Sequence, residues 1–156
     1  MQTLMYNLGV HAYGVALRLA SMFNKKARLW VEGRRNLFGR VSDALKGNTA
    51  PIIWFHAASL GEFEQGRPVI EAFKEVHPEY KILVTFFSPS GYEIRKNYKG
   101  ADWIFYMPLD TARNARRFVD IVKPRKAVFI KYEFWLNHLT RLQEIGCELY
   151  EISAIF

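Results

Sequence analysis

The sequence predicts an α/β fold built on a parallel, doubly wound sheet of about five strands. From residue 51 onward, short apolar segments rich in Ile, Val, Phe and Tyr alternate with segments of helical periodicity. The apolar segments are continuous rather than alternating, as in strands that are buried on both faces. Their starts lie roughly 22–30 residues apart, which is the length of one strand–helix unit of a parallel sheet.

The first element is an almost continuously apolar segment, residues 4–23, which predicts a helix close to the length that spans a bilayer. A stripe of polar or small residues interrupts it at steps of three and four: Asn7, His11, Gly14, Arg18, Ser21 and Lys25. That spacing places the stripe on one side of the helix. An arginine near the centre of a lone span costs roughly 2.5–3.5 kcal/mol. Attachment in the membrane interface, insertion with the stripe against protein, and packing on the domain's own core therefore stay open.

The net charge of +7 is concentrated in the N-terminal arm. Residues 1–50 hold eight lysines and arginines against two acidic residues, a net charge of +6. An arm that is both apolar and basic favours anionic lipid over nucleic acid, so we expect residues 4–35 to meet a membrane surface. A cleavable secretory signal is disfavoured, because the basic cluster Lys25–Arg35 follows the apolar run and favours the cytoplasmic side.

The remaining elements follow a polar connector over residues 39–50, where we place the boundary between an arm (1–47) and a globular domain (48–156). Pro78 closes one helix, Asp110 is the expected N-cap of another, and Gly146 is the expected residue after a third. The predicted strands are 51–56, 81–87, 103–107, 126–131 and 148–153, and the predicted helices between them are 62–76, 90–98, 111–122 and 134–145.

Several well-known motifs are absent. The sequence has no dinucleotide fingerprint, no P-loop, no His-Glu-x-x-His and no Gly-x-Ser-x-Gly. Its four histidines show no metal-ligand spacing, and its one cysteine, Cys147, is most simply a small buried apolar residue. We therefore expect no metal and no cofactor, and we look for chemistry at the loops that follow the strands.

The first such loop, residues 56–62, contains His56, Ser59, Gly61 and Glu62. Ligands of open α/β sheets bind at the carboxyl ends of the strands, and the following helix offers free backbone N–H groups there. On spacing alone, Glu62 is also well explained as a carboxylate that interacts favourably with the helix dipole.

Two more loops follow neighbouring strands. The second presents Ser88, Ser90 and Gly91, which suit either a bound phosphate or sugar hydroxyl, or a simple turn and N-cap. The third presents Lys131 and Glu133 directly after an apolar strand. Burying both charges there without partners would be too costly, so we expect them to face the surface or a partner. Since parallel strands end at one edge of a sheet, the three loops are expected to converge.

These segments resemble the N-terminal half of the 3-deoxy-D-manno-octulosonic acid (Kdo) transferases of lipopolysaccharide assembly. The resemblance rests on residues 56–62, on Val84-Thr85 followed by Ser88–Gly91, on the turn Tyr106–Asp110, on Glu133-Phe134-Trp135 with Asn137, and on the arm segment Lys26–Arg35. It covers nearly the whole chain, with the motifs in order.

The resemblance implies the Rossmann-like N-terminal domain of a GT-B glycosyltransferase at the cytoplasmic face of the inner membrane. Such an enzyme moves Kdo from CMP-Kdo onto a lipid A precursor with inversion and needs no metal or other cofactor. Its N-terminal domain binds the acceptor, through a surface that we expect to include His56, Ser59, Gly61, Ser88, Ser90, Gly91, Lys131 and Glu133. Glu62 matches the glutamate of the family's Ser-x-Gly-Glu motif, the proposed general base.

Two departures limit the comparison. The family usually reads Met-Glu-Thr-Glu-Leu-Trp where this chain has Ile130-Lys131-Tyr132-Glu133-Phe134-Trp135, so the role of the first glutamate does not transfer to Lys131. The family also continues into a nucleotide-binding domain that these 156 residues do not contain, so we expect no turnover from them alone. The alternatives are a non-catalytic lipid-binding module and a different GT-B sugar transferase.

Overall fold

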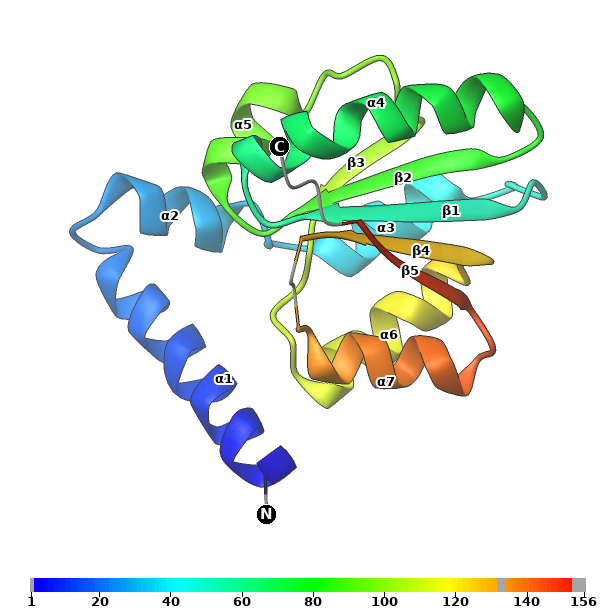
Figure 1. Ribbon diagram of the computed structural model, residues 1–156. Helices are drawn as coiled ribbons and strands as arrows, with labels where there is room; N and C mark the ends of the chain where they lie inside the picture. Colours follow the sequence, from blue (N-terminus) through cyan, green and yellow to red (C-terminus); the bar gives the residue numbers. More distant parts are fainter. Residues whose placement is uncertain (1, 132–133, 153–156) are drawn as a thin grey trace.

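The computed structural model describes residues 2–131 and 134–152, apart from the side chain of residue 2. An N-terminal run of three helices leads into alternating strands and helices (Figure 1). The elements are α1 Gln2–Ala20, α2 Lys25–Glu32, α3 Leu37–Leu45, β1 Ile52–Ala57, α4 Leu60–Val76, β2 Lys81–Phe86, α5 Pro89–Arg95, β3 Trp103–Tyr106, α6 Ala112–Val122, β4 Lys126–Ile130, α7 Leu136–Glu144 and β5 Glu148–Ile152.

The strands form one parallel sheet in the order β3-β2-β1-β4-β5. The chain therefore moves outward from β1 to β3, returns to the other side of β1 at β4, and continues to β5. In the register of the sheet, Ala57 at the end of β1 pairs with Phe86 at the end of β2, and Ile130 pairs with Ile152. Since the order reverses between β1 and β4, this edge is the expected binding side of a doubly wound sheet. The predicted fold class is confirmed.

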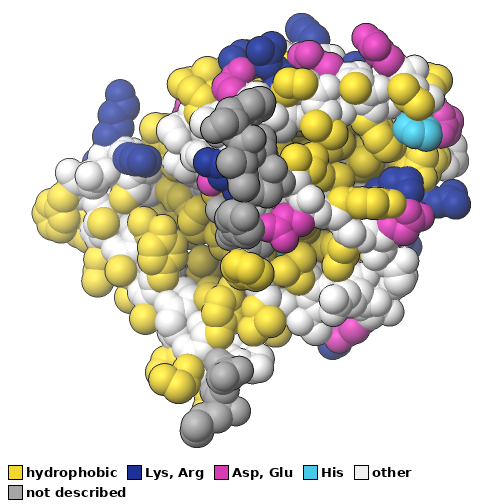
Figure 2. Space-filling view, viewed as in Figure 1, with side chains coloured by type: hydrophobic (Ala, Val, Ile, Leu, Met, Phe, Trp, Pro, Cys, Tyr) yellow, Lys and Arg dark blue, Asp and Glu magenta, His cyan; other side chains and the backbone are white. Residues whose placement is uncertain are grey.

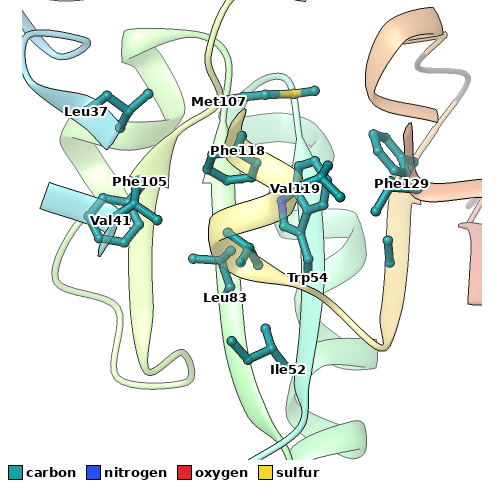
Figure 3. Close-up of a cluster of buried hydrophobic side chains, with 13 residues drawn as sticks. Leu37, Val41, Ile52, Trp54, Leu83, Phe105, Met107, Phe118, Val119 and Phe129 are labelled. Atoms are coloured by element: carbon teal, nitrogen blue, oxygen red, sulfur yellow. The ribbon is translucent and has the colours of Figure 1, made fainter. Parts of the chain in front are cut away.

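Helices cover both faces of the sheet (Figure 1). On one face, Phe63 and Ile70 of α4 pack with Phe55, Val84 and other apolar strand residues. On the other face, α3, α6 and α7 enclose a second cluster around Trp54 (Figure 3). The Trp54 ring lies 5.1 Å from the Phe118 ring and 5.5 Å from the Phe129 ring, centroid to centroid. Strands buried by both clusters explain the continuous apolar runs in the sequence.

The polar connector predicted over residues 39–50 is wrong for its first half, which belongs to α3. Leu37 and Val41 are four residues apart, so they lie on one side of the helix, and both are buried in the cluster around Trp54. Residues 37–45, which we assigned to the arm, therefore contribute to the core of the globular domain. Because Gly39 lies between these two residues and Lys46 follows the helix, the sequence around this short apolar pair looks like a polar connector.

The ends of the later elements agree with the sequence signals in two places and differ in one. The helix α4 ends just before Pro78, and Gly146 has a φ of +71° after α7, which glycine adopts without strain. Asp110 is not the N-cap of α6; that position belongs to Thr111, whose side chain accepts a hydrogen bond from Asn114 N. Asp110 is instead fully buried.

The helix α1 lies at the edge of the molecule and keeps a broad apolar face exposed (Figures 1 and 2). Gly14, from its polar stripe, is buried against Leu109, and Asn7 accepts a hydrogen bond from Asn137 of α7. The large apolar side chains exposed on α1 are Leu4, Met5, Leu8, Tyr13, Val15 and Leu19, and Met22 and Phe23 are exposed just after it. Across residues 2–131 and 134–152, none of the helices combines the length and apolarity that crossing a membrane requires.

Candidate functional site

The loops after β1, β2 and β4 meet at the carboxyl edge of the sheet, as predicted. Ser88 N donates a hydrogen bond of 2.8 Å to Ala58 O, which joins the first loop to the second. The ring of Phe87 lies 4.6 Å from that of Trp135, which joins the second loop to the segment before α7. These contacts make one continuous surface from three segments that are far apart in the sequence.

Glu62 lies in the first turn of α4, directly beyond β1. Its Oε2 accepts a hydrogen bond of 3.0 Å from Ser59 N, so that Ser59 and Glu62 form a capping box. Among the described residues, the other carboxylate oxygen has no hydrogen-bond partner. The side chain is half-buried. The capping contact fixes the carboxylate while leaving one oxygen able to accept a proton.

The remaining residues of the first two loops differ in exposure. Gly61 is exposed, and a side chain built there would meet open space. Ser88 caps α5, and its Oγ lies 2.9 Å from Ser90 Oγ, so these hydroxyls serve the turn as well as the surface. Gly91 is buried against the ring of Phe86, where a Cβ would collide with the ring. Its lack of a side chain is explained by packing.

His56 lies inside the sheet rather than on the loop. Its side chain is fully buried, and Nδ1 lies 2.9 Å from Thr85 Oγ1, which also accepts a hydrogen bond of 2.7 Å from Trp54 Nε1. Burial, reinforced by the neighbouring His138, lowers the pKa of His56 to about 3. The neutral ring is therefore part of the core beneath the loop.

The third loop is described only in part, because Glu133 falls outside the described residues. Lys131 follows β4 with a φ of +64°, a left-handed conformation that costs a non-glycine residue of order 1 kcal/mol. Its backbone N–H donates a hydrogen bond of 2.7 Å to Ile152 O. A strained residue at the carboxyl edge of the sheet is a common property of functional loops.

Arg34, which our sequence analysis did not single out, anchors the arm to this edge. Its guanidinium donates to three backbone carbonyls: Nε to Met107 O at 2.9 Å, Nη1 to Trp30 O at 3.0 Å and Nη2 to Phe87 O at 2.9 Å. It also lies 3.7 Å from the centre of the Trp30 ring. Burial lowers the pKa of Arg34 to about 9, so the group stays charged at neutral pH.

Asp110 is a second anchor, fully buried, that the sequence analysis did not identify as such. Its carboxylate accepts hydrogen bonds from Tyr6 OH of α1, from Asn137 N at 3.1 Å, and from both N and Nδ1 of His138 at 3.0 and 2.5 Å. Burial alone raises the pKa of Asp110, but these hydrogen bonds outweigh it and hold that pKa below its ordinary value. The carboxylate thereby joins α1, the loop after β3 and α7.

Among the hollows that α1 lines in the described part of the chain, two adjoin this anchored region. The apolar hollow has a volume of about 410 Å³ and is lined by Met5, Tyr6, Gly9, Val10, Tyr13, Phe87, Leu109, Asp110 and Trp135. The basic hollow has a volume of about 290 Å³ and is lined by Gly14, Arg18, Trp30, Val31, Arg34, Arg35, Leu37, Phe38, Pro108, Leu109 and Asn114. Phe87 of the second loop lines the apolar hollow, and Arg34, which donates to Phe87 O, lines the basic hollow, so both hollows adjoin the edge loops.

The fold is a Rossmann-like domain in which three loops converge at the carboxyl ends of the strands. Residues 32–156 match the family described as 3-deoxy-D-manno-octulosonic-acid transferase (kdotransferase). The chain belongs to this family, and its five-stranded sheet is the Rossmann-like N-terminal domain of a GT-B glycosyltransferase.

Individual relatives agree with this assignment. The chain is 29% identical over 128 residues to the 3-deoxy-D-manno-octulosonic acid transferase of Chlamydia trachomatis serovar D, an overlap of 80% of this chain and 29% of the relative. The enzyme of the same name from Aquifex aeolicus is 35% identical over 89 residues, covering 56% of this chain and 24% of the relative. That of Haemophilus influenzae is 30% identical over 91 residues, covering 58% and 21%. The chain thus spans less than a third of the length of these curated relatives.

Proposed function

We propose that this chain is the acceptor-binding half of a Kdo transferase that moves Kdo from CMP-Kdo to a lipid A precursor with inversion. An acceptor hydroxyl oxygen attacks the anomeric carbon of Kdo, and the bond to CMP breaks with its electron pair leaving on the phosphate oxygen. Glu62 takes the proton of the attacking hydroxyl. Family membership supports the reaction, and the donor's nucleotide is assigned to a second domain outside these 156 residues.

The observation that carries the proposal is the state of Glu62. One carboxylate oxygen is fixed by Ser59 N, and the other has no hydrogen-bond partner in the described part of the chain. A general base must be held in place and still have a free oxygen that faces the substrate surface. Ser88 and Ser90 border the same surface through the bond between Ser88 N and Ala58 O, and Lys131 supplies a cation at the end of β4.

The arm is proposed to hold the enzyme at the cytoplasmic face of the inner membrane. The support is the broad exposed apolar face of α1, where Leu8 is 71% exposed, together with Phe23 just after the helix, which is 89% exposed. Exposed apolar patches of this kind mark interaction surfaces, and the charge of the arm suits anionic lipid. In this arrangement the acceptor reaches the edge loops from the membrane side, past the apolar hollow.

Glu62→Gln tests the proposal. Glutamine at this position still accepts the hydrogen bond from Ser59 N, so the helix cap survives while the base is lost. We expect transfer from labelled CMP-Kdo to fall by about 10²- to 10⁴-fold, with folding and vesicle binding unchanged. The assay joins this chain to a Kdo transferase nucleotide domain, and the 156 residues alone are expected to give no product.

The matched control is Glu64→Gln, two residues further along the same helix. Glu64 pairs with Arg95 at 2.5 Å and Arg67 at 3.2 Å, away from the capping box, so its loss should leave the rate nearly unchanged. Full activity in Glu62→Gln would exclude Glu62 as the base. Vesicle binding without transfer from any completed enzyme would instead favour a non-catalytic lipid-binding module.

A further inference from the structure

The basic hollow has the composition of an anion site. Three arginines from different parts of the arm line it: Arg18 of α1, Arg34, and Arg35 beside it. In the described part of the chain, no aspartate or glutamate is among its lining residues. Three positive groups that share one hollow repel one another unless an anion separates them, so the hollow favours a negatively charged ligand.

Arg34 makes the charge of the hollow permanent. All three of its side-chain hydrogen bonds go to neutral backbone carbonyls, and no ion pair joins it to a carboxylate of the described residues. Because the partners of this partly buried guanidinium are dipoles and not a carboxylate, its positive charge is not neutralised at the wall of the hollow.

Three further donors are uncommitted. The side chains of Arg18 and Arg35 are exposed and make no hydrogen bond or ion pair within the described ranges. Trp30 is 7% exposed and lines the same hollow, and its Nε1 has no hydrogen-bond partner among the described residues. A buried indole N–H without an acceptor is costly, so a ligand oxygen in the hollow would satisfy it.

We infer that the basic hollow is a binding site for a phosphate group, held by Arg18 and Arg35 over the fixed charge of Arg34. A phosphate monoester carries a charge of about −1.5 to −2 at neutral pH and presents three acceptor oxygens. Those oxygens suit the forked donors of two mobile guanidinium groups and the indole N–H of Trp30. A carboxylate carries a single charge and would leave most of the positive charge of the hollow uncompensated.

The inference is independent of the proposed function, because phosphate binding needs neither a donor sugar nor Glu62. The phosphate can belong to a lipid headgroup or to a soluble phosphate compound. The apolar hollow shares Leu109 with the basic hollow, so a membrane lipid can reach it from the apolar face of α1.

The test is a titration of the full chain with inorganic phosphate, followed through the indole N–H resonance of Trp30, with acetate at equal ionic strength as the control. A second arm measures binding to vesicles containing phosphatidic acid, with phosphatidylglycerol, a phosphodiester, as the comparison. The variant R18Q/R35Q is compared with K25Q/K46Q, which changes the net charge equally at exposed lysines outside the hollow.

We expect phosphate, but not acetate, to shift the Trp30 signal, and R18Q/R35Q to weaken binding by about tenfold or more while K25Q/K46Q does not. Binding in the phosphate arm identifies a soluble ligand as sufficient. Preference for phosphatidic acid without binding of free phosphate identifies a lipid headgroup. Equal binding of phosphatidic acid and phosphatidylglycerol, weakened equally by R18Q/R35Q and K25Q/K46Q, would overturn the inference and indicate diffuse charge attraction. The absence of binding in both the phosphate and the vesicle experiments would overturn it as well.

Discussion

The fully buried Asp110 and the partly buried Arg34 are two charged residues that perform the same structural task in opposite ways. Each ties the N-terminal helices to the carboxyl edge of the sheet, Asp110 through Tyr6 and Arg34 through Phe87 O and Met107 O. Asp110 is surrounded by side-chain and backbone donors, including the titratable ring of His138. Arg34 faces only carbonyl oxygens and aromatic rings.

The difference shows that satisfying hydrogen bonds and neutralising charge are separate requirements. Around Asp110, donors on α7 and α1 use the carboxylate oxygens completely, so nothing remains to attract a ligand. Around Arg34, every polar contact is neutral, so the positive charge persists at the wall of the basic hollow. The charge of Asp110 is therefore matched by its donors, while Arg34 also contributes positive charge to the basic hollow.

The largest expected effect is the loss of the Asp110 charge. Asp110→Asn removes the negative charge and replaces one of its two acceptor oxygens by an NH2 group, which then faces donors inside the protein. Breaking such a buried network typically costs about 3–5 kcal/mol. We expect the free energy of unfolding in urea to fall by that amount. The control is Asp120→Asn, an exposed partner of Arg141, which should cost no more than about 1 kcal/mol. Equal losses in the two variants would contradict the anchoring role of Asp110.

A smaller effect is expected for Arg34→Lys, which keeps the charge and removes the fork. One ammonium nitrogen cannot reach three carbonyls placed around a guanidinium, so buried acceptors are left unpaired. The free energy of unfolding should fall by about 2–3 kcal/mol. Arg35→Lys, an exposed neighbour, should change it by no more than about 0.5 kcal/mol. If Arg34→Lys were equally harmless, the carbonyl contacts would not be what holds the arm.

The last effect is a pH dependence of the free energy of unfolding, which is small near neutral pH and separates the buried histidine from the two anchors. The pKa of His56 is lowered to about 3 in the folded protein. Between about pH 6.5 and 3, the unfolded chain therefore binds a proton at this histidine that the folded protein does not bind. Stability should therefore fall as the pH drops from about 6.5 toward 3, by about 1 kcal/mol per pH unit. The lowered pKa of Asp110 adds a further loss at the acid end, as the pH falls through its folded value.

Urea unfolding at several pH values checks this dependence. His56→Asn should flatten the slope between pH 6.5 and 4, whatever it does to stability at pH 7. His77→Asn, which alters a surface histidine beside Glu79, should leave the slope as it is. If the dependence of the free energy of unfolding on pH were unchanged in His56→Asn, His56 would not be the group that causes it.

Much of the fold was predictable because its signals are local. All five strands and the four helices after residue 60 lie where apolar runs and helical periodicity place them, with shifts of a few residues at the ends. The convergence of the three edge loops followed from the parallel arrangement alone. By contrast, α3 was missed because its apolar pair, Leu37 and Val41, is brief and lies among polar and small residues.

The candidate site was predictable only in part. Glu62 and the serines of the second loop lie at the edge that the strand pattern predicts, although the pattern does not say that Ser59 N fixes the carboxylate. His56 looked like a loop residue, but the sheet continues through it to Ala57 and buries its ring. Arg34 was treated only as one positive charge of a basic arm. Nothing near it in the sequence indicates that its side chain contacts Phe87 O and Met107 O.

The sequence by itself determined the α/β class, the order of the elements in the globular domain and the position of Glu62 at the start of a helix. These properties depend on residues within a few positions of one another. Only the tertiary structure decided which charges are buried and what faces them. Tyr6 and Asp110 are 104 residues apart, and Arg34 and Phe87 are 53 apart. The environment of a charge depends on which surfaces pack against it, and that packing brings together residues whose separation in the chain carries no such information.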